Sequence, residues 1–135
     1  MKDTLQAGLS TTRRITVDRA RTIDIMGDDA RVYATPALLE DIEMTCRELL
    51  LEHLDPGEDS VGTRVELDHM AATLDGMWVE ITATLTALDG RAASFDFTAR
   101  DVLDDVARGR HDRFVVDVEK TKARLAAKAA KAGVA

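Results

Sequence analysis

Cysteine is nearly absent from this sequence, and several features that mark other protein classes are missing altogether. The one cysteine, Cys46, has no second thiol with which to form a disulfide inside the chain, which fits a reducing cytoplasm. No run approaches the roughly 20 apolar residues that a membrane-spanning helix needs. The opening residues, 1–14, hold no apolar segment of a secretion signal. We therefore predict a cytoplasmic protein without a membrane segment.

Positive charge is also in short supply. The chain has 18 lysines and arginines against 25 aspartates and glutamates, a formal net charge of -7. Nucleic-acid binding requires clustered positive charge, so nucleic acid is not expected as the main partner. Glycine-rich phosphate loops and dinucleotide fingerprints are absent. Neither His53 nor His111 stands with cysteine at zinc-ligand spacing. We predict no metal site and no cofactor.

What the sequence does contain is one long amphipathic helix, predicted from Pro36 to Leu54. Thr35 precedes it as a helix cap, and proline is well suited to the first helical position. Pro56 and Gly57 end it. An apolar stripe recurs at helical spacing and comprises Leu38, Ile42, Thr45, Cys46 and Leu49. We interpret Cys46 as a core residue of this stripe.

Four runs with β-like alternation follow the helix, at 60–73, 76–88, 91–103 and 106–120. Asp75–Gly76 and Asp89–Gly90 separate them and favour hairpins. Shorter β-like pieces lie at 13–26, then a loop, and the tail at 120–132, rich in alanine and lysine, predicts a short exposed helix. A meander with one apolar face needs a cover, and the long helix is the available one. The 135 residues thus predict a single α+β domain spanning 1–135.

Three polar residues stand where chemistry is possible, and each has a plainer interpretation. Thr35 opens the helix, where free N–H groups stabilise an oxyanion, but it also serves simply as a cap. Glu43 falls at the edge of the apolar stripe, where a carboxylate acts as base or nucleophile, or merely reaches solvent. His69 shares a strand face with Val65 and Leu67, either as a proton shuttle or as a core histidine.

Four segments together resemble the fluoroacetyl-CoA thioesterase family of acyl-CoA thioesterases. They are ATPALLEDIEMTC, LDPGEDSVGT, HMAAT and GRHDRFVV, within about Tyr33 to Lys120. A helix opens with Thr35 and carries Glu43 eight residues on, and His69 stands seven residues after Gly62. The resemblance implies the hotdog fold, a curved antiparallel β-sheet wrapped around one long central helix.

The resemblance also implies the chemistry: hydrolysis of a short- or medium-chain acyl-CoA thioester to free acid and CoA. Thr35, Glu43 and His69 would be catalytic, with Glu43 activating water or attacking the carbonyl. Gly62 and Arg113 would bind substrate. Two subunits would pair edge to edge, with His69 beside Thr35 and Glu43 of the partner subunit, in a homodimer or tetramer.

Two other interpretations stay open, and one departure from the family bears on specificity. A non-catalytic dimer could bind an acyl-CoA or another small hydrophobic ligand, since hotdog folds host several functions. A hotdog hydratase is disfavoured because the helix start holds no histidine. Asp28 and Asp29 stand where the fluoroacetyl enzyme has an aromatic lid. This departure points away from fluoroacetyl specificity and leaves general acyl-CoA hydrolysis.

Overall fold

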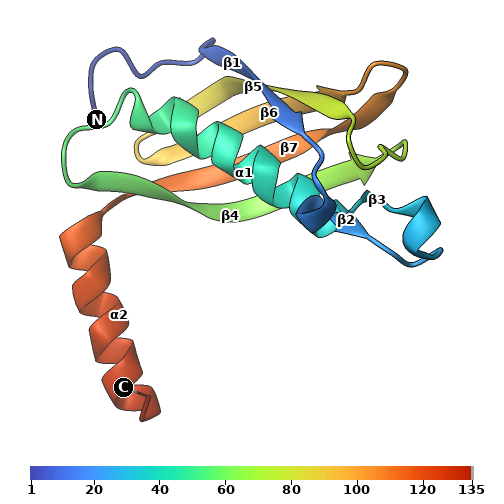
Figure 1. Ribbon diagram of the computed structural model, residues 1–135. Helices are drawn as coiled ribbons and strands as arrows, with labels where there is room; N and C mark the ends of the chain where they lie inside the picture. The colour runs from blue at the N-terminus through green and yellow to red at the C-terminus, as the bar shows by residue number, and fades with distance from the viewer. Residues whose placement is uncertain (135) are drawn as a thin grey trace.

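A computed structural model describes residues 1–134 and shows a curved antiparallel sheet wrapped around one long helix, α1 (Thr35–Leu51) (Figure 1). The sheet order is β1-β5-β6-β7-β4. The strands are Ser10–Thr16 (β1), Glu58–His69 (β4), Trp78–Asp89 (β5), Ala92–Arg100 (β6) and Asp105–Asp117 (β7). This is the predicted hotdog arrangement in the α+β class. Strands β1 and β4 form the two edges of the sheet.

Helix α1 buries the stripe that the periodicity predicted. Leu38, Ile42 and Cys46 are fully buried, and Thr45 and Leu49 are almost so. The helix begins at Thr35 and ends at Leu51, so its predicted end at Leu54 was three residues too long. Residues 52–54 form a turn that leads towards Gly57, which has a φ of 84° that glycine readily adopts.

The strands supply the opposite wall of the core, and the predicted alternation is confirmed there. Val79, Ile81, Ala83 and Leu85 of β5 are completely buried, and Phe95 and Phe97 of β6 lie beside them in the same core. Core residues facing a helix from alternate strand positions are what an antiparallel sheet with one covered face requires.

One of the two predicted hairpins is wrong. Asp89–Gly90 does join the paired strands β5 and β6. Asp75–Gly76 does not join a hairpin, because β4 pairs with β7 at one edge, whereas β5 pairs with β1 and β6. The chain between His69 and Trp78 is therefore a crossover. Asp75–Gly76 does form a turn. Which strands pair, however, depends on contacts with residues distant in sequence.

A short strap before α1 was predicted in part, as β-like pieces up to residue 26 followed by a loop. It consists of β2 (Thr22–Ile23) paired with β3 (Val32–Tyr33). A single turn of 3-10 helix, η1 (Arg19–Arg21), precedes β2, and a second, η2 (Asp28–Ala30), lies between the two strands. The buried Tyr33 hydroxyl donates to Asp41 of α1, and Arg21 Nε donates to the same carboxylate at 2.9 Å. This network fixes the strap to the first turns of the helix.

The C-terminal helix α2 (Val118–Ala132) leaves the end of β7 and projects away from the sheet (Figure 1). It begins two residues earlier than predicted, because the Asp117 side chain caps it by accepting from the backbone N–H of Lys120. None of its residues is buried, as expected for an exposed tail. Within residues 1–134, no helix combines the length and apolarity required to cross a bilayer.

Candidate active site

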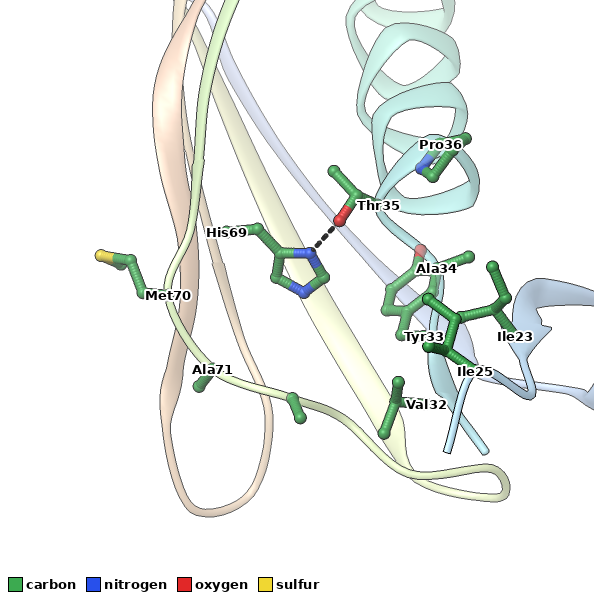
Figure 2. Close-up of a pocket in the computed structure, with 11 residues that line it drawn as sticks. Ile23, Ile25, Val32, Tyr33, Ala34, Thr35, Pro36, His69, Met70 and Ala71 are labelled. Carbon is green, nitrogen blue, oxygen red and sulfur yellow. Dashed lines mark hydrogen bonds between the residues drawn. The ribbon is translucent and has the colours of Figure 1, made fainter. Parts of the chain in front are cut away.

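Thr35 and His69 meet at the start of α1. Thr35 Oγ1 lies 2.7 Å from His69 Nδ1, in a hydrogen bond within one chain (Figure 2). Thr35 was predicted to cap the helix, and this is wrong: Ala34 occupies the cap position and offers no side-chain hydrogen bond. A poor cap of this kind costs a helix about 1 kcal/mol. The Thr35 hydroxyl therefore bonds to His69, and α1 begins without a side-chain cap.

The His69 ring borders an apolar pocket of about 350 Å³ between the strap, the start of α1 and the end of β4. Ile23, Ile25 and Val32 lie across the pocket from the ring (Figure 2). His69 Nε2 is buried and has no hydrogen-bond partner within residues 1–134. Burial lowers the pKa of His69, against the opposing effect of the Ala71 backbone. The ring is therefore neutral near pH 7 and has unused hydrogen-bonding capacity.

Glu43 lies elsewhere, over the middle of β4. A Cβ built on Gly62 would stand 3.0 Å from Glu43 Oε1, 3.2 Å from His111 Cε1 and 3.5 Å from Arg113 Nη1. The backbone of Gly62 is not in the left-handed region, so its conformation does not call for glycine. The close contacts that a Cβ would make do favour glycine at this position. The missing side chain lets a carboxylate, an imidazole and a guanidinium approach one point. Glu43 itself is half-buried, as its place at the edge of the stripe predicted.

A β-bulge places both sets of residues on the same face of β4. The register with β7 shifts between Gly62 and Arg64. A strict alternation of period two would put Gly62 and His69 on opposite faces. The extra residue at the bulge resets the alternation, so Gly62 faces Glu43 while His69 faces Thr35, both on the side of α1.

Buried polar groups hold Arg113 beside Glu43. Arg113 Nε donates to Ser60 Oγ at 2.8 Å, and Nη2 donates to the Ser60 carbonyl at 2.8 Å. Nη1 lies 3.2 Å from His111 Nε2. Burial lowers the pKa of Arg113, and the negative charge of Glu43 opposes that shift. Cys46 is also near, but burial raises the pKa of its thiol to about 12, so it stays protonated.

Sequence reasoning missed Ser60 and gave His111 no role beyond the absence of zinc. A signal was available, because His111 and Arg113 alternate with Val115 on one strand face and all three are buried. Two ionisable residues in a row of core positions indicate a polar network. Its acceptors on β4 could not be found without the strand pairing.

The two groups of residues are separated within one chain. Thr35 and Glu43 are eight residues apart on α1, or about 12 Å along the helix axis. The prediction that His69 pairs with Thr35 of the partner subunit is wrong, since this pair forms within a single chain. Within residues 1–134, Glu43 makes no side-chain hydrogen bond or ion pair with either of them. One chain therefore presents two separate groups of candidate residues, or half-sites: Thr35 with His69, and Glu43 with Gly62 and Arg113.

Comparisons with known proteins identify relatives of this chain in sequence and in fold. The family model described as fluoroacetyl-CoA-specific thioesterase matches residues 17–119. The fluoroacetyl-CoA thioesterase of Streptantibioticus cattleyicolor is 31% identical over 132 residues, which cover 93% of this chain and 95% of that protein. A solved structure of a fluoroacetyl-CoA thioesterase superposes with a TM-score of 0.86 at 30% identity, covering 93% and 98% of the two chains.

A further solved structure shows a variant of that fluoroacetyl enzyme in complex with fluoroacetate and CoA. It matches at 30% identity with a TM-score of 0.79, covering 87% of this chain and 99% of the other. Both the family model and the curated relative span most of the sequence, including the helix start, the bulged strand and the buried arginine. On these grounds the chain belongs to the fluoroacetyl-CoA-specific thioesterase family.

Proposed function

We propose that this protein hydrolyses a short- or medium-chain acyl-CoA thioester to the free acid and CoA. The observation that carries the proposal is the His69 ring, bonded to Thr35 on one side and carrying a buried, unpaired Nε2 beside an apolar pocket. A buried nitrogen without a partner is costly unless a ligand or water completes it. The apolar lining suits an acyl group, and the start of α1 adds unpaired N–H groups and a positive dipole end.

The proposed reaction uses side chains, the backbone N–H of Gly62 and water, and needs no cofactor. The oxygen of water bonds to the thioester carbonyl carbon, the carbon–sulfur bond breaks, and CoA leaves as the thiol. Glu43 takes the proton from the attacking water, or attacks the carbonyl itself to form an anhydride that water then cleaves. When Glu43 acts as the base, His69 relays the proton that Glu43 took from water to the departing sulfur, and Thr35 orients the ring. Gly62 and Arg113 hold the carbonyl oxygen as negative charge develops on it.

We further propose that the half-sites are completed in a homodimer. Strand β4 is an edge of the sheet, and its side chains from Val61 to Arg64 are exposed. Edge strands readily pair with a second copy. Antiparallel pairing centred between Val65 and Glu66 sets Gly62 of one copy opposite His69 of the partner subunit. Glu43, which lies over Gly62, then shares one thioester with the Thr35–His69 pair of the other chain.

Complementation between inactive variants tests the shared site. We expect co-expressed Glu43→Gln and His69→Asn chains to regain about a quarter of wild-type activity. Random pairing makes half of the dimers mixed, and each mixed dimer holds one intact site. The two chains carry different tags, and the unselected mixture of dimers is assayed for release of free thiol from an acyl-CoA. A mixture as inactive as either parent, with mixed dimers verified by both tags, overturns the shared site.

A panel of acyl-CoA esters tests the activity itself. We expect hydrolysis of short or medium esters, retained after dialysis against EDTA, and no preference for fluoroacetyl-CoA over acetyl-CoA. Asp28 and Asp29 stand where the resemblance places the aromatic lid, and the Asp28 carboxylate accepts from Arg19 at 2.7 Å and from Arg31 at 3.1 Å on the surface. Thiol release is measured for each ester. Saturable binding without turnover across the panel would reject the enzyme in favour of a binding protein.

We place this activity in the cytoplasm, where CoA esters occur and a lone cysteine stays reduced. Cell fractionation checks this placement, and recovery outside the cytoplasmic fraction would contradict it.

A further inference from the structure

His111 is buried and has no role in the proposed reaction as described so far for Glu43, His69 and Arg113. Its side chain is 1% exposed, Arg113 is 3% exposed and Ser60 is 6% exposed. The three side chains form a continuous hydrogen-bonded chain beneath Gly62, on the side of the sheet that faces Glu43. Polar groups buried so deeply are retained at a cost in solvation, and they specify a geometry only when every member is paired.

The hydrogen bonds of His111 determine where its proton lies. Nδ1 stands 2.8 Å from the backbone carbonyl oxygen of Arg64, which only accepts, so Nδ1 carries the proton and donates. Burial lowers the pKa of His111, so the ring has no second proton at neutral pH. Nε2 therefore keeps its lone pair and accepts from Arg113 Nη1 at 3.2 Å. Because Nε2 is occupied, His111 is not available to shuttle protons to a substrate.

Arg113 is consequently fixed through each of its three nitrogens. Ser60 accepts from Nε and Nη2, and His111 accepts from Nη1. A planar guanidinium with all three nitrogens engaged has one orientation. That orientation holds Nη1 beside the vacant space over Gly62, across from Glu43 Oε1. No ion pair joins Arg113 to Glu43 in the described part of the chain, so Glu43 does not hold the guanidinium in place.

We propose that His111 is a positioning residue for thioester hydrolysis: through Nε2 it holds the Arg113 guanidinium at the point over Gly62 that also faces the Glu43 carboxylate. The inference rests on the proposed function. It assigns His111 no contact with the substrate. Without the Nε2 acceptor, one buried N–H of Arg113 loses its partner, and the guanidinium turns to find another. A displacement of about 1 Å at a reacting centre can lower a rate by about a hundredfold.

Two amide substitutions separate the roles of the two ring nitrogens. In His111→Gln the amide oxygen reaches the place of Nε2 and still accepts from Arg113. In His111→Asn the shorter amide replaces only Nδ1, donating to the Arg64 carbonyl and leaving Arg113 without its acceptor. We expect kcat to fall about tenfold to a hundredfold in the asparagine variant and to stay within about threefold of wild type in the glutamine variant. KM should change little in either, because the ground-state acyl pocket is untouched.

A double-mutant cycle distinguishes positioning from general support of the fold. If His111 acts through Arg113, adding His111→Asn to an Arg113→Met variant lowers kcat no further, whereas independent effects multiply. Equal kcat in the asparagine and glutamine variants, or multiplying effects in the cycle, overturns the proposal. Should the asparagine variant fail to fold, Ser60→Ala takes its place, since it removes the acceptor of Arg113 Nε and should also lower kcat at constant KM. An inactive wild-type enzyme would instead refute the proposed function.

Discussion

Replacing Glu43 by glutamine is expected to lower kcat for acyl-CoA hydrolysis by about a thousandfold. The amide has nearly the shape of the carboxylate but neither accepts a proton from water nor attacks a carbonyl. The loss should fall on kcat rather than on KM, because a group that acts only as the bond breaks contributes little to ground-state binding. Initial rates of thiol release over a range of substrate concentrations separate the two constants.

The chain offers a matched control for this substitution. Glu40 lies one turn earlier on α1 and is exposed. Glu40→Gln removes the same charge from the same helix and should leave kcat unchanged. Because Glu43 makes no side-chain hydrogen bond or ion pair within residues 1–134, Glu43→Gln should also unfold at nearly the same temperature as wild type. A Glu43→Gln enzyme retaining a tenth of wild-type kcat would remove Glu43 from the reaction.

Replacing His69 by asparagine is expected to lower kcat about a hundredfold. The asparagine amide can keep the hydrogen bond to Thr35 that Nδ1 makes, but it has no counterpart of the unpaired Nε2. The substitution therefore tests the nitrogen that borders the pocket while sparing the one that meets Thr35. Thiol release measured at several substrate concentrations reports kcat, and thermal unfolding reports whether the strap and helix start remain in place.

A second threonine–histidine pair in the same chain provides the control. Thr4 Oγ1 lies 2.7 Å from His53 Nδ1, near the opposite end of α1 and in an exposed setting. It repeats the hydrogen bond of Thr35 and His69 without the apolar pocket. His53→Asn should leave catalysis unaffected. If both asparagine variants lose activity equally, or if His69→Asn loses none, the assignment of His69 as a catalytic residue fails.

A hydrogen bond between threonine and histidine does not by itself identify a candidate catalytic site. The surroundings of the two pairs distinguish them. At Thr35 the hydroxyl is withheld from capping the helix, the histidine is half-buried, and an apolar cavity adjoins the ring. His53 is half-buried as well, but neither Thr4 nor His53 lines the apolar pocket that adjoins His69, and Thr4 does not stand at the start of a helix. The function proposed for the first site depends on its apolar pocket, because a low local dielectric strengthens hydrogen bonds and charge interactions.

The sequence by itself determined the parts that depend on periodicity. The stripe on α1 and the alternation of β5 and β6 specify which faces are buried, because helices and strands repeat at 3.6 and 2 residues whatever their partners. The candidate residues Thr35, Glu43 and His69 could also be named in advance from the sequence pattern, and the resemblance to the thioesterase family added Gly62 and Arg113. The strap strand β3, which lies in the predicted loop, could not be named, since two residues are too few to show a period.

Only the tertiary structure decided how those residues are grouped. The bulge between Gly62 and Arg64 turns Gly62 and His69 to the same face, although simple alternation separates them. Strand pairing brings Ser60 of β4 against His111 and Arg113 of β7, which stand about fifty residues later. Folding also brings His69 at the end of β4 against Thr35 at the start of α1, although the two stand 34 residues apart. These outcomes depend on register and distance between segments remote in sequence, which local patterns do not encode.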